Sequence, residues 1–292
     1  MNPLQKLQQR HGQGEGRALY ELILRMRFGL SRTDILLGKD TTLSAKDNEE
    51  LQIIVGRVAE GEPVQYVLGC EEFCGRTFLV GPGVLVPRPE TQQLVQLVEQ
   101  RLPSGSTVLD VGTGSGCIAV TLALDGYRVA AIDISDEALA YARRNADRLG
   151  AEVEFVKQDI LALSCFPLRG ESKPQTSSPL RHSPKGGAGR GLACIVSNPP
   201  YICLSERASM DDNVLLHEPH LALFVPDDDP LRFYRAIGEF GRRQLSADGQ
   251  LFLEVNRAYA KDVEQLLRGF GYAETEIFND QYDNQRFVWA RF

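Results

Sequence analysis

The stretch Thr107-Val108-Leu109-Asp110-Val111-Gly112-Thr113-Gly114-Ser115-Gly116 decides the fold of this chain. Its mostly apolar first half predicts a buried strand, and its glycines let the backbone turn sharply and approach a ligand without a Cβ atom in the way. Residues 117–124 are almost entirely apolar and predict a helix packed on the sheet. A strand, a glycine-rich loop and a helix in this order indicate an α/β domain with a mostly parallel sheet.

A second expected strand, 128–132, runs directly into Asp133. An acid about 20 residues after such glycines can accept hydrogen bonds from the ribose hydroxyl groups of an adenosine. The loop departs from the G-x-G-x-x-G dinucleotide fingerprint, which disfavours NAD. The sequence therefore predicts a nucleoside-type cofactor. The simpler alternative is a tight strand-to-helix turn, with Asp133 as a helix N-cap. The expected cofactor-binding residues are Gly112, Thr113, Gly114, Ser115, Gly116 and Asp133.

The tetrapeptide Asn198-Pro199-Pro200-Tyr201 follows an apolar run over 193–197 that predicts another buried strand. The two prolines end the strand and hold the asparagine at the carboxyl edge of the sheet. The asparagine side chain and the proline carbonyl groups are acceptors, so a planar NH2 group could meet two of them, with Tyr201 flat against its face. These four residues are the candidate catalytic residues for an exocyclic base amine or a carboxamide. An ordinary proline turn is the alternative.

Composition narrows the class of protein. The chain has 292 residues, 43% of them hydrophobic, and a formal net charge of -7, which disfavours a duplex-DNA enzyme because such enzymes bind phosphates with a basic face. Six cysteines are scattered through mostly apolar contexts, as in reduced cytosolic proteins, and their spacing predicts no metal site. No apolar run reaches the roughly 20 residues that span a bilayer, so a cytoplasmic protein without membrane contact is expected.

The first 71 residues predict a helical domain. From Gly16 to about Glu60 apolar residues recur at helical spacing, as at Leu19, Leu22, Ile23 and Met26. Ser31-Arg32-Thr33-Asp34 resembles a capping box that opens a second helix, which Gly38 would end.

Three further segments are expected after the helical domain. Residues 72–90 predict a linking β-hairpin that turns at Gly81-Pro82-Gly83, and 91–292 predict the α/β domain. Within it, 169–190 are rich in Ser, Pro, Gly, Lys and Arg, and this composition predicts a disordered surface loop because it buries too little apolar area to offset chain entropy.

Several motifs together resemble one known family. The stretch 110–116 with Asp133 is similar to the S-adenosylmethionine site of class I methyltransferases, and Asn-Pro-Pro-Tyr is similar to that of amino-group methyltransferases. From about Arg17 to Phe292 the chain resembles the PrmC or HemK family, the release factor glutamine N5-methyltransferases. The segments that carry this resemblance are 63–69, 78–80, 84–91, His217-Glu218-Pro219, Ala222-Leu223 and 283–286.

The resemblance implies a Rossmann-like methyltransferase domain, preceded by a small all-α domain that recognises the protein substrate. It implies S-adenosylmethionine as cofactor, with Asp159 and Ile160 at the adenine and Asn198 near the methyl group. The implied substrate is the glutamine of the Gly-Gly-Gln motif of peptide chain release factors, with no stable nucleic-acid partner. Alternatives are a ribosomal-protein glutamine methyltransferase, an adenine-N6 methyltransferase of nucleic acid, and a non-catalytic cofactor-binding scaffold. Glu90 and Thr91 are expected near the cofactor and Arg88 and Glu254 as a buried pair, and all four are expected to be structural.

Overall fold

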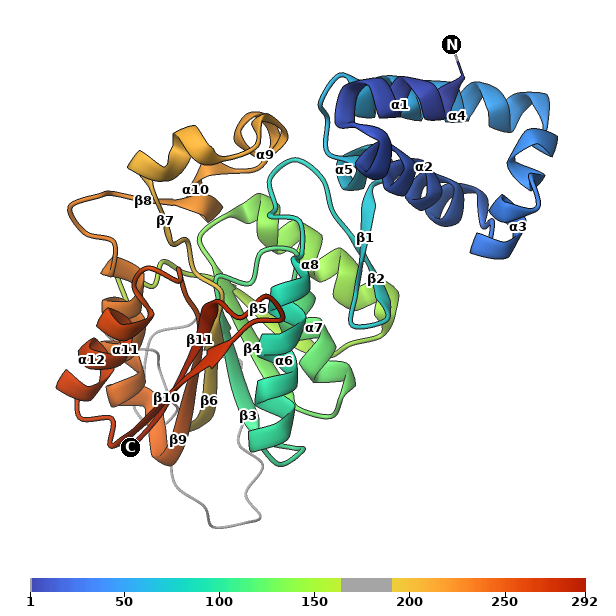
Figure 1. Cartoon of the computed structure of the whole chain (residues 1–292). Coiled ribbons are helices and arrows are strands. Elements are labelled where there is room, and N and C mark those ends of the chain that lie inside the picture. Colours follow the sequence, from blue (N-terminus) through green and yellow to red (C-terminus); the bar gives the residue numbers. More distant parts are fainter. Residues whose placement is uncertain (1, 164–190) are drawn as a thin grey trace. The chain divides into compact units, whose positions relative to one another are not determined.

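The computed structural model describes residues 2–163 and 191–292 (Figure 1). The predicted loop over 169–190 lies outside the described residues. By its contacts the chain divides into a helical unit and an α/β unit. The helical unit contains the residues up to Glu71, Val80–Pro82 and Met210–Glu218; the α/β unit contains Glu72–Leu79, Gly83–Ser209 and Pro219–Phe292.

The helical unit is built from short helices around one small core. Its core includes the side chains of Leu7, Ile23, Leu24, Leu51 and Val55, all of them buried. Among the described residues of the whole chain, no helix combines the length and the apolarity needed to cross a bilayer. The elements of this unit are α1 (Pro3–His11), α2 (Gln13–Phe28), α3 (Arg32–Leu36), η1 (Lys39–Thr42), α4 (Ala45–Ala59), α5 (Val64–Leu68) and α9 (Asp212–His217).

The start of the first helix differs from the expectation, whereas the predicted capping box is confirmed. Helix α1 precedes the residues that the apolar pattern marks, and Asn2 Oδ1 caps it by accepting from Leu4 N at 2.9 Å. Gly16 allows α1 and α2 to touch, because a Cβ atom there would lie 2.5 Å from Gln8 N. At α3, Ser31 Oγ accepts from Asp34 N at 3.1 Å and Asp34 Oδ2 accepts from Ser31 N at 3.0 Å.

A hairpin is present, but it spans 70–79 instead of the predicted 72–90, and its predicted turn is wrong. Strands β1 (Cys70–Phe73) and β2 (Arg76–Leu79) form a two-stranded sheet. Cys74 and Gly75 connect them, with φ values of 47° and 69°, so this pair supplies the left-handed turn instead of residues 81–83. Gly83 serves elsewhere, in the loop that borders the cavity described below.

The α/β unit contains a seven-stranded sheet, and this confirms the predicted Rossmann-like, mostly parallel fold. Its strand order is β10-β11-β9-β6-β3-β4-β5. Strands β9, β6, β3, β4 and β5 are parallel to one another, and β11 is antiparallel to both of its neighbours, β9 and β10. The chain enters at β3 and builds β4 and β5 on one side and β6 and β9 on the other, which makes a topological switch point beside β3. The strands are β3 (Thr107–Val111), β4 (Arg128–Asp133), β5 (Val153–Lys157), β6 (Leu192–Ser197), β9 (Leu245–Glu254), β10 (Glu274–Asn279) and β11 (Gln285–Arg291).

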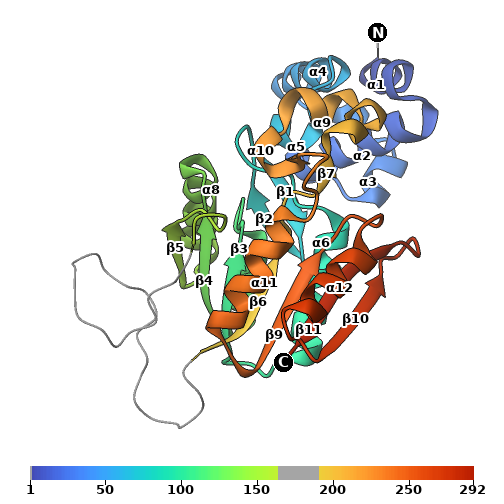
Figure 2. The same cartoon turned by 90° about the vertical axis from the view of Figure 1, so that its left-hand side faces the viewer.

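Two apolar cores cover the two faces of this sheet. Helices α6 (Pro89–Arg101), α7 (Cys117–Leu124) and α8 (Asp136–Leu149) pack on the face that contains Val108, whereas α11 (Arg232–Gln244) and α12 (Ala260–Gly269) pack on the face that contains Leu109. Successive strand residues alternate between the faces, so the apolar run fills both cores. Figure 2 is turned so that α11 and α12 face the viewer. The short elements are β7 (Ile202–Cys203), η2 (Leu204–Ser209), α10 (His220–Leu223) and β8 (Phe224–Val225).

Asn145 on α8 joins the hairpin to the glycine-rich loop. Its Oδ1 accepts from Leu79 N at 2.7 Å, and its Nδ2 donates to Leu79 O at 3.0 Å and to Ser115 O at 2.9 Å. The side chain is completely buried, so it replaces solvent for backbone groups of both segments.

Asn145→Ala should lower the free energy of unfolding by about 2–4 kcal/mol, because it leaves buried backbone groups without partners and opens a cavity. Urea denaturation followed by tryptophan fluorescence measures this loss, since the chain's one tryptophan, Trp289, is buried on β11 of the same unit. Asn279→Ala is the control, because Asn279 is exposed and its side-chain amide donates to Asp283 Oδ1 at the surface, at 2.6 Å. Equal losses for both variants would contradict the proposed bridge.

Candidate active site

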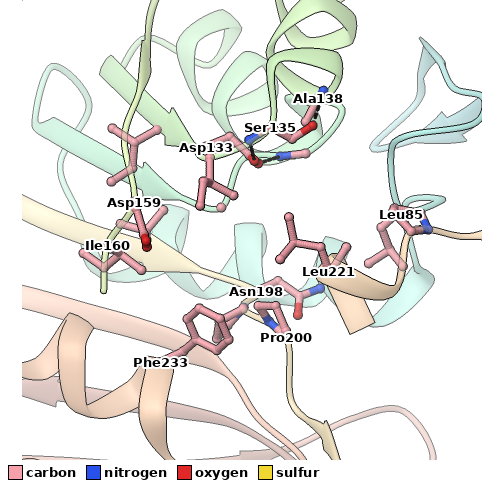
Figure 3. Close-up of a pocket in the computed structure, with 18 of the residues that line it drawn as sticks. Leu85, Asp133, Ser135, Ala138, Asp159, Ile160, Asn198, Pro200, Leu221 and Phe233 are labelled. Atoms are coloured by element: carbon pink, nitrogen blue, oxygen red, sulfur yellow. Dashed lines mark hydrogen bonds between the residues drawn. The ribbon is translucent and has the colours of Figure 1, made fainter. Parts of the chain in front are cut away.

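A cavity of about 320 Å³ lies at the carboxyl ends of the central strands. Figure 3 shows Asp133 and Ser135 on one side of it and Asn198, Pro200 and Phe233 on the opposite side. The predicted site residues that line it are Gly112, Gly114, Asp133, Asp159, Ile160, Asn198, Pro199 and Pro200. The other predicted site residues do not line it; they are Thr113, Ser115, Gly116 and Tyr201.

The glycine-rich loop divides into residues that face the cavity and residues that hold the loop. A Cβ atom at Gly112 or Gly114 would meet no atom within 4 Å, so the space before the loop is open. Thr113 points inward, where its Oγ1 donates to Asp110 Oδ2 at 2.7 Å. Burial raises the pKa of Asp110 to about 7, and the Thr113 hydrogen bond opposes this rise.

Gly116 has a packing role. It precedes α7 with a φ of 81°, and a Cβ atom there would lie 3.0 Å from Ala142 Cα on α8. A side chain here would be strained at this φ and crowded against α8, so glycine favours this close approach.

Asp133 ends β4 and binds the loop with its carboxylate. Oδ2 accepts from Gly114 N at 2.8 Å and Oδ1 accepts from Ser135 N at 2.9 Å. Burial raises the pKa of Asp133, and these backbone N–H groups oppose the rise. Asp133 is not the N-cap of α8, since Ser135 Oγ accepts from Ala138 N at 3.2 Å. Each carboxylate oxygen keeps a further lone pair, so Asp133 can still accept from two ligand hydroxyl groups.

Apolar side chains form the walls near the end of β5. Ile160 is buried and Phe233 also lines the cavity, while the exposed Ile134 and Leu221 border it. Asp159 Oδ1 accepts from Leu161 N at 2.8 Å, which fixes the turn after β5. An open glycine loop, a carboxylate and apolar walls are the features that an adenosine-containing cofactor requires, and these residues fit one.

The Asn-Pro-Pro-Tyr segment faces in two directions. Asn198 lines the cavity and its Nδ2 donates to Thr91 Oγ1 at 3.1 Å. Tyr201 turns to the core instead, where its OH donates to Glu254 Oε1 at 3.1 Å. Burial and the Glu254 carboxylate both raise the pKa of Tyr201. The predicted stacking of Tyr201 on a substrate amide therefore has no support in the cavity lining of the described residues.

Thr91 and Glu254 complete this arrangement; the sequence predicts both as structural, with Thr91 near the cofactor, but it does not predict their contact with each other or the contact of Thr91 with Asn198. Thr91 Oγ1 donates to Glu254 Oε2 at 2.8 Å, and both side chains are buried. The signal that could have indicated Thr91 is its position at the start of a proline-initiated helix, in the segment 84–91.

The sheet order, the glycine loop and the strand-end acid define the class: this is an S-adenosylmethionine-dependent methyltransferase. A family model described as a methyltransferase domain matches residues 102–172. A solved methyltransferase from Pyrococcus furiosus has the same fold, with 16% identity and a TM-score of 0.51 over 84% of this chain and 98% of that one.

Two relatives and a second family model then identify the family. A model described as the PrmC N-terminal domain matches residues 4–69. A release factor glutamine methyltransferase from Bacteroides thetaiotaomicron is 43% identical and covers 98% of this chain and 96% of its own, and one from Flavobacterium psychrophilum is 36% identical and covers 94% and 91%. The chain belongs to the release factor glutamine methyltransferase family.

Gly116→Ala should destabilise the protein by roughly 2–4 kcal/mol, because an alanine is strained at this φ and its methyl group is also crowded against Ala142. Gly105→Ala is the matched control, since Gly105 has a φ of 83° with no atom within 4 Å of its Cβ position. The control should lose only about 1 kcal/mol, from backbone strain. Chemical denaturation of both variants measures the difference, and equal losses would rule out the packing role.

Proposed function

We propose that this protein transfers a methyl group from S-adenosylmethionine to the side-chain amide nitrogen of a glutamine in a peptide chain release factor. The family resemblance points to the glutamine of the Gly-Gly-Gln motif. The observation that carries the proposal is the shared cavity, in which Gly112, Gly114 and Asp133 lie together with Asn198 and Pro199.

The donor half of the cavity suits an adenosylated sulfonium. In the proposal Asp133 accepts from the ribose hydroxyl groups, the loop 112–116 holds the methionine part, and Asp159 with Ile160 contacts the adenine. When bound, S-adenosylmethionine supplies an electrophilic methyl carbon.

The acceptor half has to position a poor nucleophile, since the amide lone pair is delocalised into the carbonyl group. Asn198 Oδ1 and the Pro199 carbonyl oxygen accept from the substrate NH2 group. They thereby aim the nitrogen at the cavity and stabilise the positive charge that develops on it. The proton leaves to water after the transfer. Tyr201 supports this edge from the core through Glu254.

The helical domain over 1–71 is proposed to recognise the release factor. A single carboxamide offers little binding energy, so specificity has to come from a larger surface. The net charge of -7 supports a protein substrate over a nucleic acid. A cytoplasmic location remains a prediction from the sequence.

Asp133→Ala should weaken S-adenosylmethionine binding by about 1.5–3 kcal/mol for each lost charge-assisted hydrogen bond. Isothermal titration calorimetry measures it. Asp136→Ala is the control, because Asp136 is an exposed acid on the same segment that pairs with Lys157. A dissociation constant that is unchanged in Asp133→Ala would mean that the ribose is held by other residues.

Asn198→Ala should lower the rate of glutamine methylation by about 10²–10³-fold, because one of two oriented acceptors is lost. Labelled S-adenosylmethionine is incubated with a release factor, with the same factor carrying Gln→Ala in its Gly-Gly-Gln motif, with ribosomal protein and with duplex DNA. Only the unaltered release factor should be labelled. Asn279→Ala serves as the remote control. Stronger labelling of ribosomal protein or DNA by the wild-type enzyme would overturn the proposed function.

A further inference from the structure

A chain of hydrogen bonds runs from the buried Glu254 to the cavity. Glu254 ends β9, and its two carboxylate oxygens accept from Thr91 Oγ1 at 2.8 Å and from Tyr201 OH at 3.1 Å. Thr91 Oγ1 in turn accepts from Asn198 Nδ2 at 3.1 Å. Glu254 and Thr91 are only 1% and 3% exposed, so water does not compete for these bonds.

The direction of these bonds follows from the chemistry of the groups. An ionised carboxylate can only accept, and the Thr91 hydroxyl has a single proton, which it gives to Glu254. Thr91 Oγ1 then has only lone pairs available, so any further hydrogen bond that it makes comes from a donor. The side-chain amide of Asn198 offers a donor at one end and an acceptor at the other. Its NH2 end therefore turns to Thr91, and Oδ1 is left for the cavity.

We propose that Glu254, acting through Thr91, is a positioning residue that selects which end of the Asn198 amide faces the substrate. The inference rests on the proposed function, in which Asn198 Oδ1 accepts from the substrate NH2 group. A flipped Asn198 would present its own NH2 to that group, and two donors repel. Glu254 thereby sets the polarity of a contact that it does not make itself.

The electrostatic surroundings of Glu254 make this device sensitive to pH. Burial raises the pKa of Glu254 to about 7, while the hydrogen bonds from Thr91 and Tyr201 and the charge of Arg286 oppose the rise. A protonated carboxyl has a donor of its own, so Thr91 no longer has to donate towards it. The polarity is therefore enforced above this pKa and lost as the pH falls below it. The titratable groups that act on Glu254 or on its partner Tyr201 are Arg88 and Glu90 beside Thr91, Tyr201, Tyr234 and Arg286.

Two substitutions at Thr91 separate orientation from packing. Thr91→Ser keeps the hydroxyl group and should keep most of the turnover. Thr91→Val keeps the volume but removes the acceptor that holds Asn198 Nδ2, and it should lower kcat by about 10²-fold, as for loss of one oriented electrostatic contact. Glu254→Gln has nearly the same shape, yet its NH2 group can donate to Thr91 and release the constraint, so a loss of similar size is expected.

The assay measures kcat and KM for a release factor at saturating S-adenosylmethionine, together with donor affinity by calorimetry and melting temperature. Thr91→Val and Glu254→Gln should lower kcat with donor affinity unchanged. Tyr127→Phe is the control; it removes a buried bond from Tyr127 OH to Leu102 O, of 3.0 Å, at the opposite end of the sheet, and should have wild-type kcat. Near pH 7 kcat should increase as the pH rises, because Glu254 becomes ionised there. This increase should persist in Tyr127→Phe and vanish in Glu254→Gln.

Combination with Asn198→Ala gives the decisive readout. If Glu254 acts by orienting Asn198, then adding Thr91→Val or Glu254→Gln to Asn198→Ala should lower kcat no further, whereas a merely structural role predicts additive losses. Wild-type kcat in Glu254→Gln, equal kcat in the serine and valine variants, or additive losses would each overturn the inference. If Asn198→Ala itself keeps wild-type kcat, or the wild-type enzyme labels no glutamine, the proposed function fails first.

Discussion

The register between β3 and β6 is the constraint on which the site depends. In this parallel pair Val111 lies opposite Ser197, and Ser197 Oγ donates to the Val111 carbonyl oxygen at 2.6 Å inside the sheet. The next residues, Gly112 and Asn198, therefore leave the sheet next to each other. After Gly112 the chain continues to α7 on one face of the sheet, whereas after Asn198 it continues to Tyr201 and then to α11 on the other face. The space between the two strand ends therefore remains open to a ligand. Two segments 86 residues apart thus share one cavity.

The sheet was predictable because its strands carry local signals. Short apolar runs that end in glycine, aspartate or proline marked β3, β4 and β6, and the observed bounds, such as Leu192–Ser197 for the predicted 193–197, agree closely. Helix α1 was missed because residues 3–11 are mainly polar; what buries Leu7 is packing on α2 and α4, which no local pattern encodes. The hairpin turn was misplaced because Gly81-Pro82-Gly83 is a stronger local turn signal than Cys74, which adopts a left-handed φ despite its side chain.

The residues that line the cavity were predictable where each of them directly follows a strand. The loop glycines, Asp133 and Asn198 each follow a strand, and a strand end in an α/β fold faces a ligand. The supporting contacts have no such signal. Thr91 and Glu254 are 163 residues apart, and their hydrogen bond exists only because α6 packs against β9. The direction of Tyr201 depends on the same buried carboxylate, so the sequence could name the residue but not where its ring would point.

The cavity is lined by residues that follow different strands, and this arrangement has an evolutionary consequence. In the proposed function, residues that follow β3, β4 and β5 bind the donor, whereas Asn198, Pro199 and Pro200 after β6 face the substrate amide. Substitutions in that segment can change which nucleophile is accepted, and they leave the residues that bind the donor in place. Insertions within β6 are a different matter. One added residue would turn every following side chain to the other face and carry Asn198 away from Gly112. The geometry of the cavity therefore tolerates replacement of a residue at the strand end better than a change of strand length.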